Sequence, residues 1–149
     1  MRTPAELDGI FRAAGLRITP QRQAVFRALY RATDHPTAEV VYARVCEEVP
    51  SISLRTVYGV LHDLVGLGEV NALDVGLGAT RYDPTPDHHH HLVCTSCGEV
   101  RDLFLDGVDV DVPAEQAGGF ELGAPEITWR GRCPACREIH HHTREEADA

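Results

Sequence analysis

The fold is decided by residues 52–83, whose sequence is ISLRTVYGVLHDLVGLGEVNALDVGLGATRYD. Ser53 is of a residue type that caps helix N-termini. The apolar residues after it recur every three or four positions, at Leu54, Val57, Leu61 and Leu64. Gly66 and Gly68 then end the predicted helix. The following segments, EVNALD, the turn VGLG and ATRYD, are typical of a two-stranded hairpin. A capped helix followed directly by a hairpin predicts the recognition helix and wing of a winged helix-turn-helix.

Three further helices are predicted before this stretch. One covers about residues 20–32, where a threonine precedes a proline at the first helical position. A second begins after residues 36–37 and places valines on one face, at Val41, Val45 and Val49. A shorter leading helix is expected at about residues 4–13. We therefore predict a winged-helix DNA-binding domain over residues 1–83, with its third capped helix in the major groove and its hairpin along the DNA backbone.

The second half of the chain has a different pattern. Residues 84–90, PTPDHHH, carry two prolines and no periodicity, and we interpret them as a linker. Beyond it, HLVCTS and EVRDLFL are expected to form two strands, residues 112–118 a helix, and FELGAPEITWRG a further strand. Residues 91–149 are thus predicted to be a small α/β domain with a polar tail, which makes the fold class α+β. The tail includes the run His140–His142, to which we assign no site.

Composition and charge narrow the function. The chain has 149 residues, 43% apolar and 25% charged, which is typical of a globular protein. It lacks the run of about 20 apolar residues that a membrane span needs, and its start lacks the form of a signal peptide, so we expect a cytoplasmic protein without a membrane partner. The net charge is −9, but residues 1–83 hold 9 arginines against 10 acidic residues, whereas residues 84–149 hold 5 against 13. Only the first part is therefore a candidate for DNA contact.

Four of the five cysteines form two pairs, Cys94-x-x-Cys97 and Cys133-x-x-Cys136, with 35 residues between them. Each pair offers two thiolates from one tight turn, and two such turns make a closed tetrahedral site of the structural zinc type. The alternative is a redox dithiol, but two complete pairs favour metal. The zinc would connect the beginning of the small domain to its end. Cys46 is expected to be a small buried residue of the second helix.

A second metal site is predicted from histidine and carboxylate residues. In a strand, His89 and His91 point to the same side, which makes half of a metal site. Asp83 precedes them across the linker, Asp102 lies on the next predicted strand, and His35 would add a ligand from the first domain. Such a mixed nitrogen and oxygen set bridging two domains suits iron, manganese, zinc or nickel. The alternative is that the histidine run is merely a solvated linker.

Five segments together resemble the ferric uptake regulator family of metal-dependent bacterial repressors. They are LRITPQRQAVFRAL, DHPTAEVVY, ISLRTVYGVLHDLVGLGEV, RYDPTPDHHHHLVCTSCGEVRDL and GRCPACRE, and they cover roughly residues 7–137 in the family's order. The resemblance implies a winged-helix domain followed by a small dimerisation domain. It also implies a homodimer that binds an inverted-repeat operator in double-stranded DNA.

The resemblance also implies roles for individual residues. Structural zinc is held by cysteines matching Cys94, Cys97, Cys133 and Cys136. The regulatory metal occupies positions matching His35, Asp83, His89, His91 and Asp102. Aspartate at both carboxylate positions matches the peroxide-sensing branch, in which bound Fe(II) reacts with hydrogen peroxide and a histidine matching His35 or His89 gains an oxygen. The regulatory ion is therefore expected to be Fe(II) or Mn(II). The alternative is an iron, manganese, zinc or nickel uptake regulator of the same family.

Two departures from the family pattern stand out. Many relatives have a histidine eight residues before the third zinc cysteine, where this chain has Pro125. This disfavours a third metal site and leaves His88 and His90 as candidate pieces of one. Relatives usually have a polar residue after the tyrosine of the recognition helix, where this chain has Gly59, so its base contacts are expected to differ.

DNA-contacting residues are predicted off the apolar stripe of the recognition helix. Arg55 is expected to contact a guanine edge or a phosphate, and Tyr58 a thymine methyl or a phosphate, with Thr56 beside them. Further phosphate contacts are expected from Arg17, Arg22 and Arg81. An enzyme is disfavoured because HExxH and HxE beside PCxxC are absent and the cysteine site is closed. A zinc-ribbon interaction module would leave the capped helices unexplained.

Overall fold

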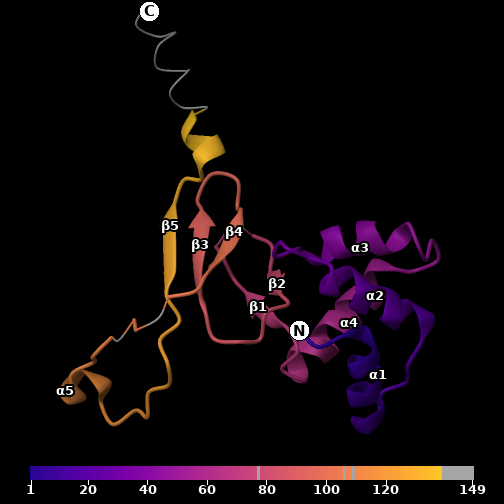
Figure 1. The fold of residues 1–149 in the computed structure, drawn as a ribbon, viewed down its shortest axis with the longest axis horizontal. Coiled ribbons are helices and arrows are strands. Elements are labelled where there is room, and N and C mark those ends of the chain that lie inside the picture. The colour runs from indigo at the N-terminus through magenta and orange to yellow at the C-terminus, as the bar shows by residue number, and fades with distance from the viewer. Residues whose placement is uncertain (77, 106, 109, 139–149) are drawn as a thin grey trace, which may run out of the picture. The chain divides into compact units, whose positions relative to one another are not determined.

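A computed structural model describes residues 1–138 except positions 77, 106 and 109. The predicted tail run His140–His142 lies outside these residues. The chain divides into two compact units, the first being Met1–Pro86 and the second beginning at Asp87. Figure 1 shows the helices of the first unit in indigo to magenta and the strands of the second in orange and yellow.

Four helices make up most of the first unit. Their bounds are α1 Pro4–Ala13, α2 Pro20–Tyr30, α3 Ala38–Cys46 and α4 Leu54–Gly66. Each helix is preceded by a residue whose side-chain hydroxyl accepts a hydrogen bond from a backbone N–H of the first turn. These capping residues are Thr3, Thr19, Thr37 and Ser53. All four predicted helices are thus confirmed. Helix α2 ends at Tyr30, two residues before the predicted end at residue 32.

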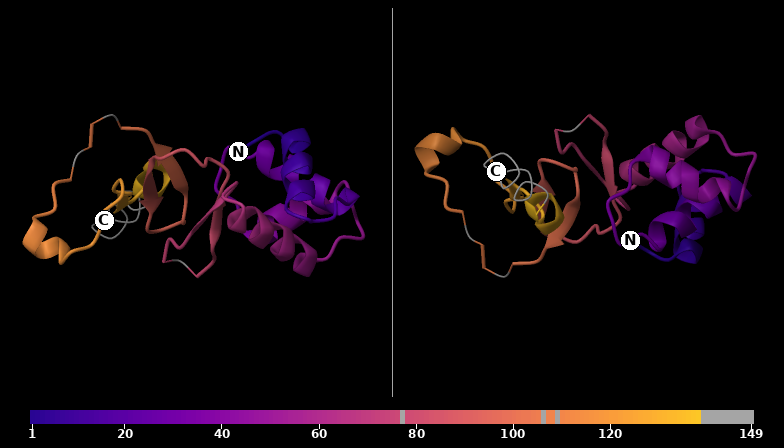
Figure 2. Two further views of the ribbon diagram at one scale, coloured as in Figure 1. Left: turned by 90° about the horizontal axis from the view of Figure 1, so that it is seen from below. Right: turned by 90° about the horizontal axis from the view of Figure 1, so that it is seen from above.

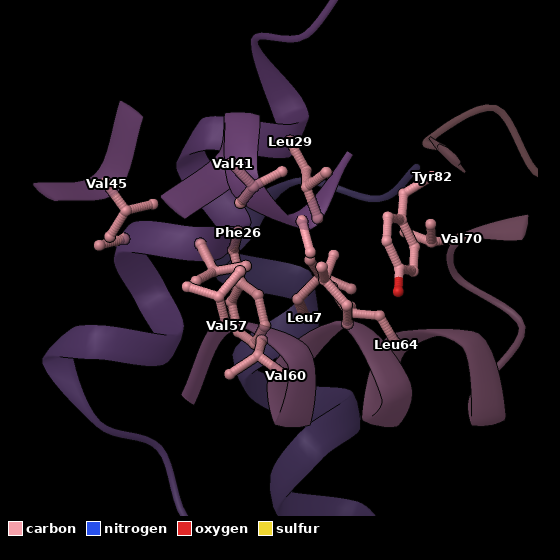
Figure 3. Close-up of a cluster of buried hydrophobic side chains, with 14 of the residues drawn as sticks. Leu7, Phe26, Leu29, Val41, Val45, Val57, Val60, Leu64, Val70 and Tyr82 are labelled. Carbon is pink, nitrogen blue, oxygen red and sulfur yellow. The ribbon is translucent and has the colours of Figure 1, made fainter. Parts of the chain in front are cut away.

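The inward faces of these helices form one hydrophobic core. Its largest fully buried members include Phe11 and Phe26, whose ring centroids lie 4.8 Å apart. α4 contributes Val57, Val60, Leu61 and Leu64 to this core, whereas Leu54, predicted as part of its apolar stripe, is only partly buried. Figure 3 shows Val57, Val60 and Leu64 facing the rest of the core. Val49, predicted to share one helix face with Val41 and Val45, lies past the end of α3 and is only partly buried.

A short hairpin follows α4 and packs back on the start of α3. Strand β1 (Asn71–Leu73) pairs antiparallel with β2 (Arg81–Asp83). The Tyr82 backbone N–H donates to the Pro36 carbonyl oxygen at 3.0 Å, and Arg81 forms an isolated antiparallel bridge with Thr37. Just before β1, the buried Glu69 forms an ion pair with Arg2, which connects the N-terminal segment to the hairpin. The predicted wing is present and is fixed to the segment that leads into α3.

The second unit contains a three-stranded sheet. Its strands are β3 His90–Cys94, β4 Val100–Leu103 and β5 Thr128–Gly131, in the order β4-β3-β5. β3 is antiparallel to β4 and parallel to β5. The helix α5 (Ala114–Ala117) lies away from the sheet, at the far end of the connection from β4 to β5 (Figures 1 and 2).

One predicted strand is too long. The sequence predicts a strand over residues 120–131, but only Thr128–Gly131 pair, and 120–127 are irregular. Gly123 and Pro125 explain the difference, since glycine weakens a strand and proline lacks the N–H that a ladder needs. No helix among the described residues is both long enough and apolar enough to cross a membrane.

The two units differ in how much apolar surface they bury. All members of the hydrophobic core cluster belong to the first unit. Among the described residues of the second unit, the buried apolar side chains are Val93, Cys94 and Val100. A core this small supplies little hydrophobic stabilisation. The second unit therefore needs another source of stability.

The core of the first unit predicts a large cost for truncating α4. Leu61 is fully buried, so Leu61→Ala should lower the free energy of unfolding by about 2–5 kcal/mol. Urea unfolding followed by far-UV circular dichroism measures this, because α1 to α4 dominate the helical signal. His62→Ala, at an exposed position of the same helix, should cost far less. Equal costs for the two variants would contradict the assigned core.

Candidate functional site

The four predicted zinc cysteines lie together at one end of the sheet. Cys94 ends β3 and is opposite Gly131 of the parallel strand β5, just before Cys133. Gly98, whose φ of +75° favours glycine, closes the turn after Cys94 with an N–H donated to its carbonyl oxygen at 3.0 Å. The Sγ atoms of Cys94, Cys97, Cys133 and Cys136 all lie within 4.8 Å of one another.

The electrostatics of this cluster call for a cation. The Cys133 backbone N–H donates to the Cys94 Sγ at 3.3 Å and, with further backbone N–H groups, lowers the pKa of Cys94 to about 6. Hydrogen bonds to the sulfurs of Cys133 and Cys97 raise the pKa of Cys136 to about 12. Four thiolates at this spacing repel one another unless a divalent ion neutralises them. Four converging sulfurs are the donor set of structural zinc, and these residues fit it.

A histidine and carboxylate pair lies inside the first unit. His35 Nε2 is 3.6 Å from Asp83 Oδ1, and both side chains are buried. The hairpin brings them together, because Arg81 of β2 donates through Nη1 to the His35 carbonyl oxygen at 3.0 Å. The Thr85 backbone N–H donates to Asp83 Oδ1 at 2.7 Å and orients the carboxylate.

A second set of nitrogen and oxygen donors lies inside the second unit. The rings of His89 and His91 are 4.5 Å apart, and His91 pairs in register with Asp102 of β4. His89 Nε2 is 3.3 Å from Asp102 Oδ1. His89 Nδ1 lies 2.6 Å from the Asp87 carbonyl oxygen, which requires Nδ1 to carry a proton, so that in the neutral ring the lone pair is on Nε2. Such a backbone contact is the usual way of orienting a metal-binding imidazole.

Glu126 lies beside this set and was not predicted from the sequence. Its Oε1 lies 3.4 Å from His91 Nδ1, where a carboxylate can orient the ring as the Asp87 carbonyl orients His89. Glu126 comes from the irregular segment before β5, and no spacing rule connects it to His91.

The other two histidines of the run lie on the opposite side, as alternation along an extended chain requires. The rings of His88 and His90 are 5.3 Å apart. His90 Nδ1 accepts the Ile127 backbone N–H at 3.3 Å, and the His90 ring meets the edge of Trp129 with 5.8 Å between centroids. His90 is therefore engaged in joining β3 to the segment before β5.

The outward face of α4 carries the candidate DNA contacts. Exposed residues at helical spacing form this face: Arg55, Tyr58, Gly59 and His62. His62 is a candidate that the sequence reasoning missed, although it lies one turn after Tyr58. Thr56 is half-buried, with its Oγ1 2.8 Å from Ser53 Oγ at the helix cap.

The predicted phosphate-binding arginines have different surroundings. Arg22 donates to the Arg17 carbonyl oxygen at 2.9 Å and to Asp63 Oδ2 at 2.6 Å, so it holds α4 in place. Arg81 donates to His35, as described above. The DNA contacts of these two residues stay predictions. Within the part of the chain that the structure describes, Arg17, Arg31 and Arg55 form no ion pair with a carboxylate.

Comparison with known proteins identifies the family. The model of the ferric uptake regulator family matches residues 13–128. The chain belongs to the ferric uptake regulator family. It is accordingly a metal-responsive regulator with the mixed helix and sheet fold of that family.

Relatives within the ferric uptake regulator family include peroxide-responsive repressors. The one from Staphylococcus epidermidis is 34% identical over 128 residues, which are 85% of each chain. Among solved structures, a zinc-bound manganese uptake regulator is 28% identical with a TM-score of 0.68, covering 89% of this chain and 99% of the other. A zinc uptake regulator in complex with zinc and DNA is 27% identical with a TM-score of 0.62, covering 93% and 95%.

The cysteine cluster predicts that zinc maintains the second unit. Cys136→Ser should lose the bound zinc and shift the fluorescence of Trp129, the chain's single tryptophan, to longer wavelength as the sheet loosens. The helical circular dichroism of the first unit should stay. Cys46→Ser, outside the cluster, is the matched control and should keep both zinc and emission. A Cys136→Ser variant with full zinc content would refute this assignment.

Proposed function

We propose that this protein is a metal-dependent, DNA-binding transcriptional repressor that senses peroxide through Fe(II)-dependent oxidation of a histidine. The observation that supports it best is the presence of a prepared donor set in each unit. The first unit offers His35 and Asp83, and the second offers His89, His91 and Asp102. A single ion bound by both sets would join the two units.

The donor types support Fe(II) or Mn(II) as the regulatory ion. Imidazole nitrogens suit iron, zinc and nickel, and carboxylate oxygens favour harder ions such as Mn(II). The five proposed ligands are three imidazoles and two carboxylates, with no thiolate, in contrast to the four-cysteine cluster. Zinc would accordingly be the structural ion and the mixed site the exchangeable one.

The switch follows from this division of ligands. With the ion bound, donors from both units would fix the relative orientation of the units. Without it, the chain around the boundary between Pro86 and Asp87 would be free to sample other orientations. Only a fraction of the metal-free population then has the DNA-competent arrangement, so apparent operator affinity falls. Metal binding and operator binding therefore strengthen each other by the same factor.

The second unit supports dimerisation. Large apolar side chains are exposed there, including Phe104, Phe120, Leu122 and Trp129. Exposed apolar area of this kind marks an interaction surface, and a second copy of the chain would cover it. A twofold dimer presents two copies of α4 and so requires an inverted-repeat operator. We assign base and phosphate contact to Arg55, Thr56, Tyr58, Arg17 and Arg22.

The peroxide-sensing role has two supports. Aspartate occupies both carboxylate positions, and relatives at 32–34% identity are peroxide-responsive repressors. Bound Fe(II) would supply the one-electron chemistry that cleaves the O–O bond of hydrogen peroxide. Overall, one peroxide oxygen would add to an adjacent imidazole, at His35 or His89, and the other would leave as water. The protein's part is to hold the His35 backbone in place through Arg81 and the His89 ring through the Asp87 carbonyl. The alternative is an iron, manganese, zinc or nickel uptake regulator that uses the same ligands without oxidation.

The bridging site predicts that Asp83→Asn weakens the coupling between metal and DNA. The free Mn(II) concentration needed for half-maximal operator binding should rise at least 10- to 100-fold, because a charged ligand is lost. Fluorescence anisotropy of a labelled operator, titrated with Mn(II), measures this. Asp74→Asn, an exposed acidic residue of the same hairpin, should behave as the unchanged protein. An unaltered Mn(II) requirement in Asp83→Asn would refute the site.

The peroxide role predicts a chemical mark. Protein loaded anaerobically with Fe(II) and treated with low hydrogen peroxide should gain one oxygen atom on a peptide containing His35 or His89, and should release its operator. Peptide mass mapping detects the change, and Mn(II)-loaded protein is the control that should stay unmodified. If the Fe(II) form keeps unmodified peptides and intact operator binding, the protein is an uptake regulator instead.

A further inference from the structure

Tyr58 on the outward face of α4 is hydrogen-bonded to α3. Its hydroxyl donates to Glu39 Oε1 at 2.8 Å. The tyrosine is 44% exposed, and Glu39 is exposed in the first turn of α3. This hydrogen bond raises the pKa of Tyr58 and lowers the pKa of Glu39. A neutral phenol and an ionised carboxylate therefore face each other at neutral pH.

The contact is not needed to hold the two helices together. α3 and α4 are packed through buried side chains such as Val41, Val45, Val57 and Val60. An exposed hydrogen bond adds little to stability, because water replaces it at small cost. The hydrogen bond instead determines the orientation of the Tyr58 side chain, because it engages the hydroxyl and restricts rotation of the ring about the side-chain bonds.

The neighbourhood leaves the ring open to an incoming duplex. Gly59 follows Tyr58, and a Cβ built there would meet nothing within 4 Å. The space beside Tyr58 is therefore open, although a side chain at position 59 would fit there. Arg55 and His62 flank it about one turn away on either side. The aromatic ring of Tyr58 is the large apolar group of this face.

We propose that Glu39 is a positioning residue for base recognition, which holds the Tyr58 hydroxyl so that the ring, and not the hydroxyl, meets the DNA. This inference rests on the proposed DNA-binding function. A tyrosine whose hydroxyl is engaged makes a poor phosphate donor but still offers an apolar edge to a thymine methyl in the major groove. Tyr58 then contributes to sequence preference more than to general affinity.

The negative charge of Glu39 also favours specific over non-specific DNA binding. A carboxylate beside the recognition helix repels the phosphates of any duplex, whatever its sequence. Glu39 therefore lowers affinity for all DNA while it maintains the contact that distinguishes one sequence. Both effects increase the ratio of specific to non-specific binding.

The test uses full-length Mn(II)-loaded protein and three duplexes. The first is selected from a random pool by the unaltered protein, and the second is a scrambled duplex of the same composition. In the third, single thymines of the selected duplex are replaced by deoxyuridine, which lacks only the methyl group. Replacing the thymine that Tyr58 contacts, at one position in each half-site, should lower the affinity of the unaltered protein by about fourfold, the value of one buried methyl.

Three variants separate the hydrogen bond from the charge. Glu39→Ala should abolish the preference for thymine over deoxyuridine and bind the scrambled duplex more tightly. Glu39→Gln keeps an acceptor oxygen, so it should retain the thymine preference while binding all duplexes more tightly. Tyr58→Phe should lose the preference as Glu39→Ala does, and the double variant should be no worse than either single one.

Controls make each outcome decisive. Glu47→Gln removes an exposed charge at the other end of α3 and should leave the thymine preference intact. The thermal midpoint of Glu39→Ala should equal that of the unaltered protein, which excludes a folding defect. A full thymine preference in Glu39→Ala, or additive losses in the double variant, would overturn the positioning role. If the unaltered protein selects no duplex at all, the proposed DNA-binding function fails first.

Discussion

The contact between β2 and the segment before α3 is the interaction on which the first unit's chemistry depends. Through it, Arg81 holds the backbone of His35, and Tyr82 hydrogen-bonds to Pro36. The same segment ends in Thr37, which caps α3. His35, a proposed metal ligand, is thus only two residues from the residue that caps α3. Under the proposed function, an ion bound to His35 would act directly on the first helix of the helix-turn-helix.

The second unit is organised by a different constraint. A sheet that buries so little apolar surface among its described residues has to be stabilised by bonds that do not depend on area. Cys94 ends β3, and Cys133 follows the end of the neighbouring strand β5 by two residues, so a metal bound to both joins the beginning of the unit to its end. On the other side of β3, the antiparallel register with β4 aligns His91 with Asp102. The cysteine cluster and the proposed regulatory donors therefore share one sheet, so in our proposal the structural metal also holds the regulatory donors in place.

Much of this could be predicted from the sequence because helix caps and apolar spacing act locally. Ser53 and the stripe after it define α4, and two CxxC pairs define the cysteine cluster. What escaped prediction depends on chain segments meeting in space. Glu126 reaches His91 only because β5 runs parallel to β3, and Arg22 reaches Asp63 only in the packed helices. The strand over 120–131 was predicted too long because a single proline and glycine were outweighed by the apolar pattern.

Electrostatics decide how such a protein can recognise DNA at all. The chain carries a net charge of −9. Residues 1–86 contain nine arginines, each of which the structure describes, and five of these arginines form ion pairs with carboxylates. Few cations remain to release counterions from the phosphate backbone, so non-specific affinity must be low. Specific affinity then has to come from close contacts made by α4. In our proposal, Tyr58, which Glu39 orients and beside which Gly59 leaves open space, supplies such a contact without adding positive charge.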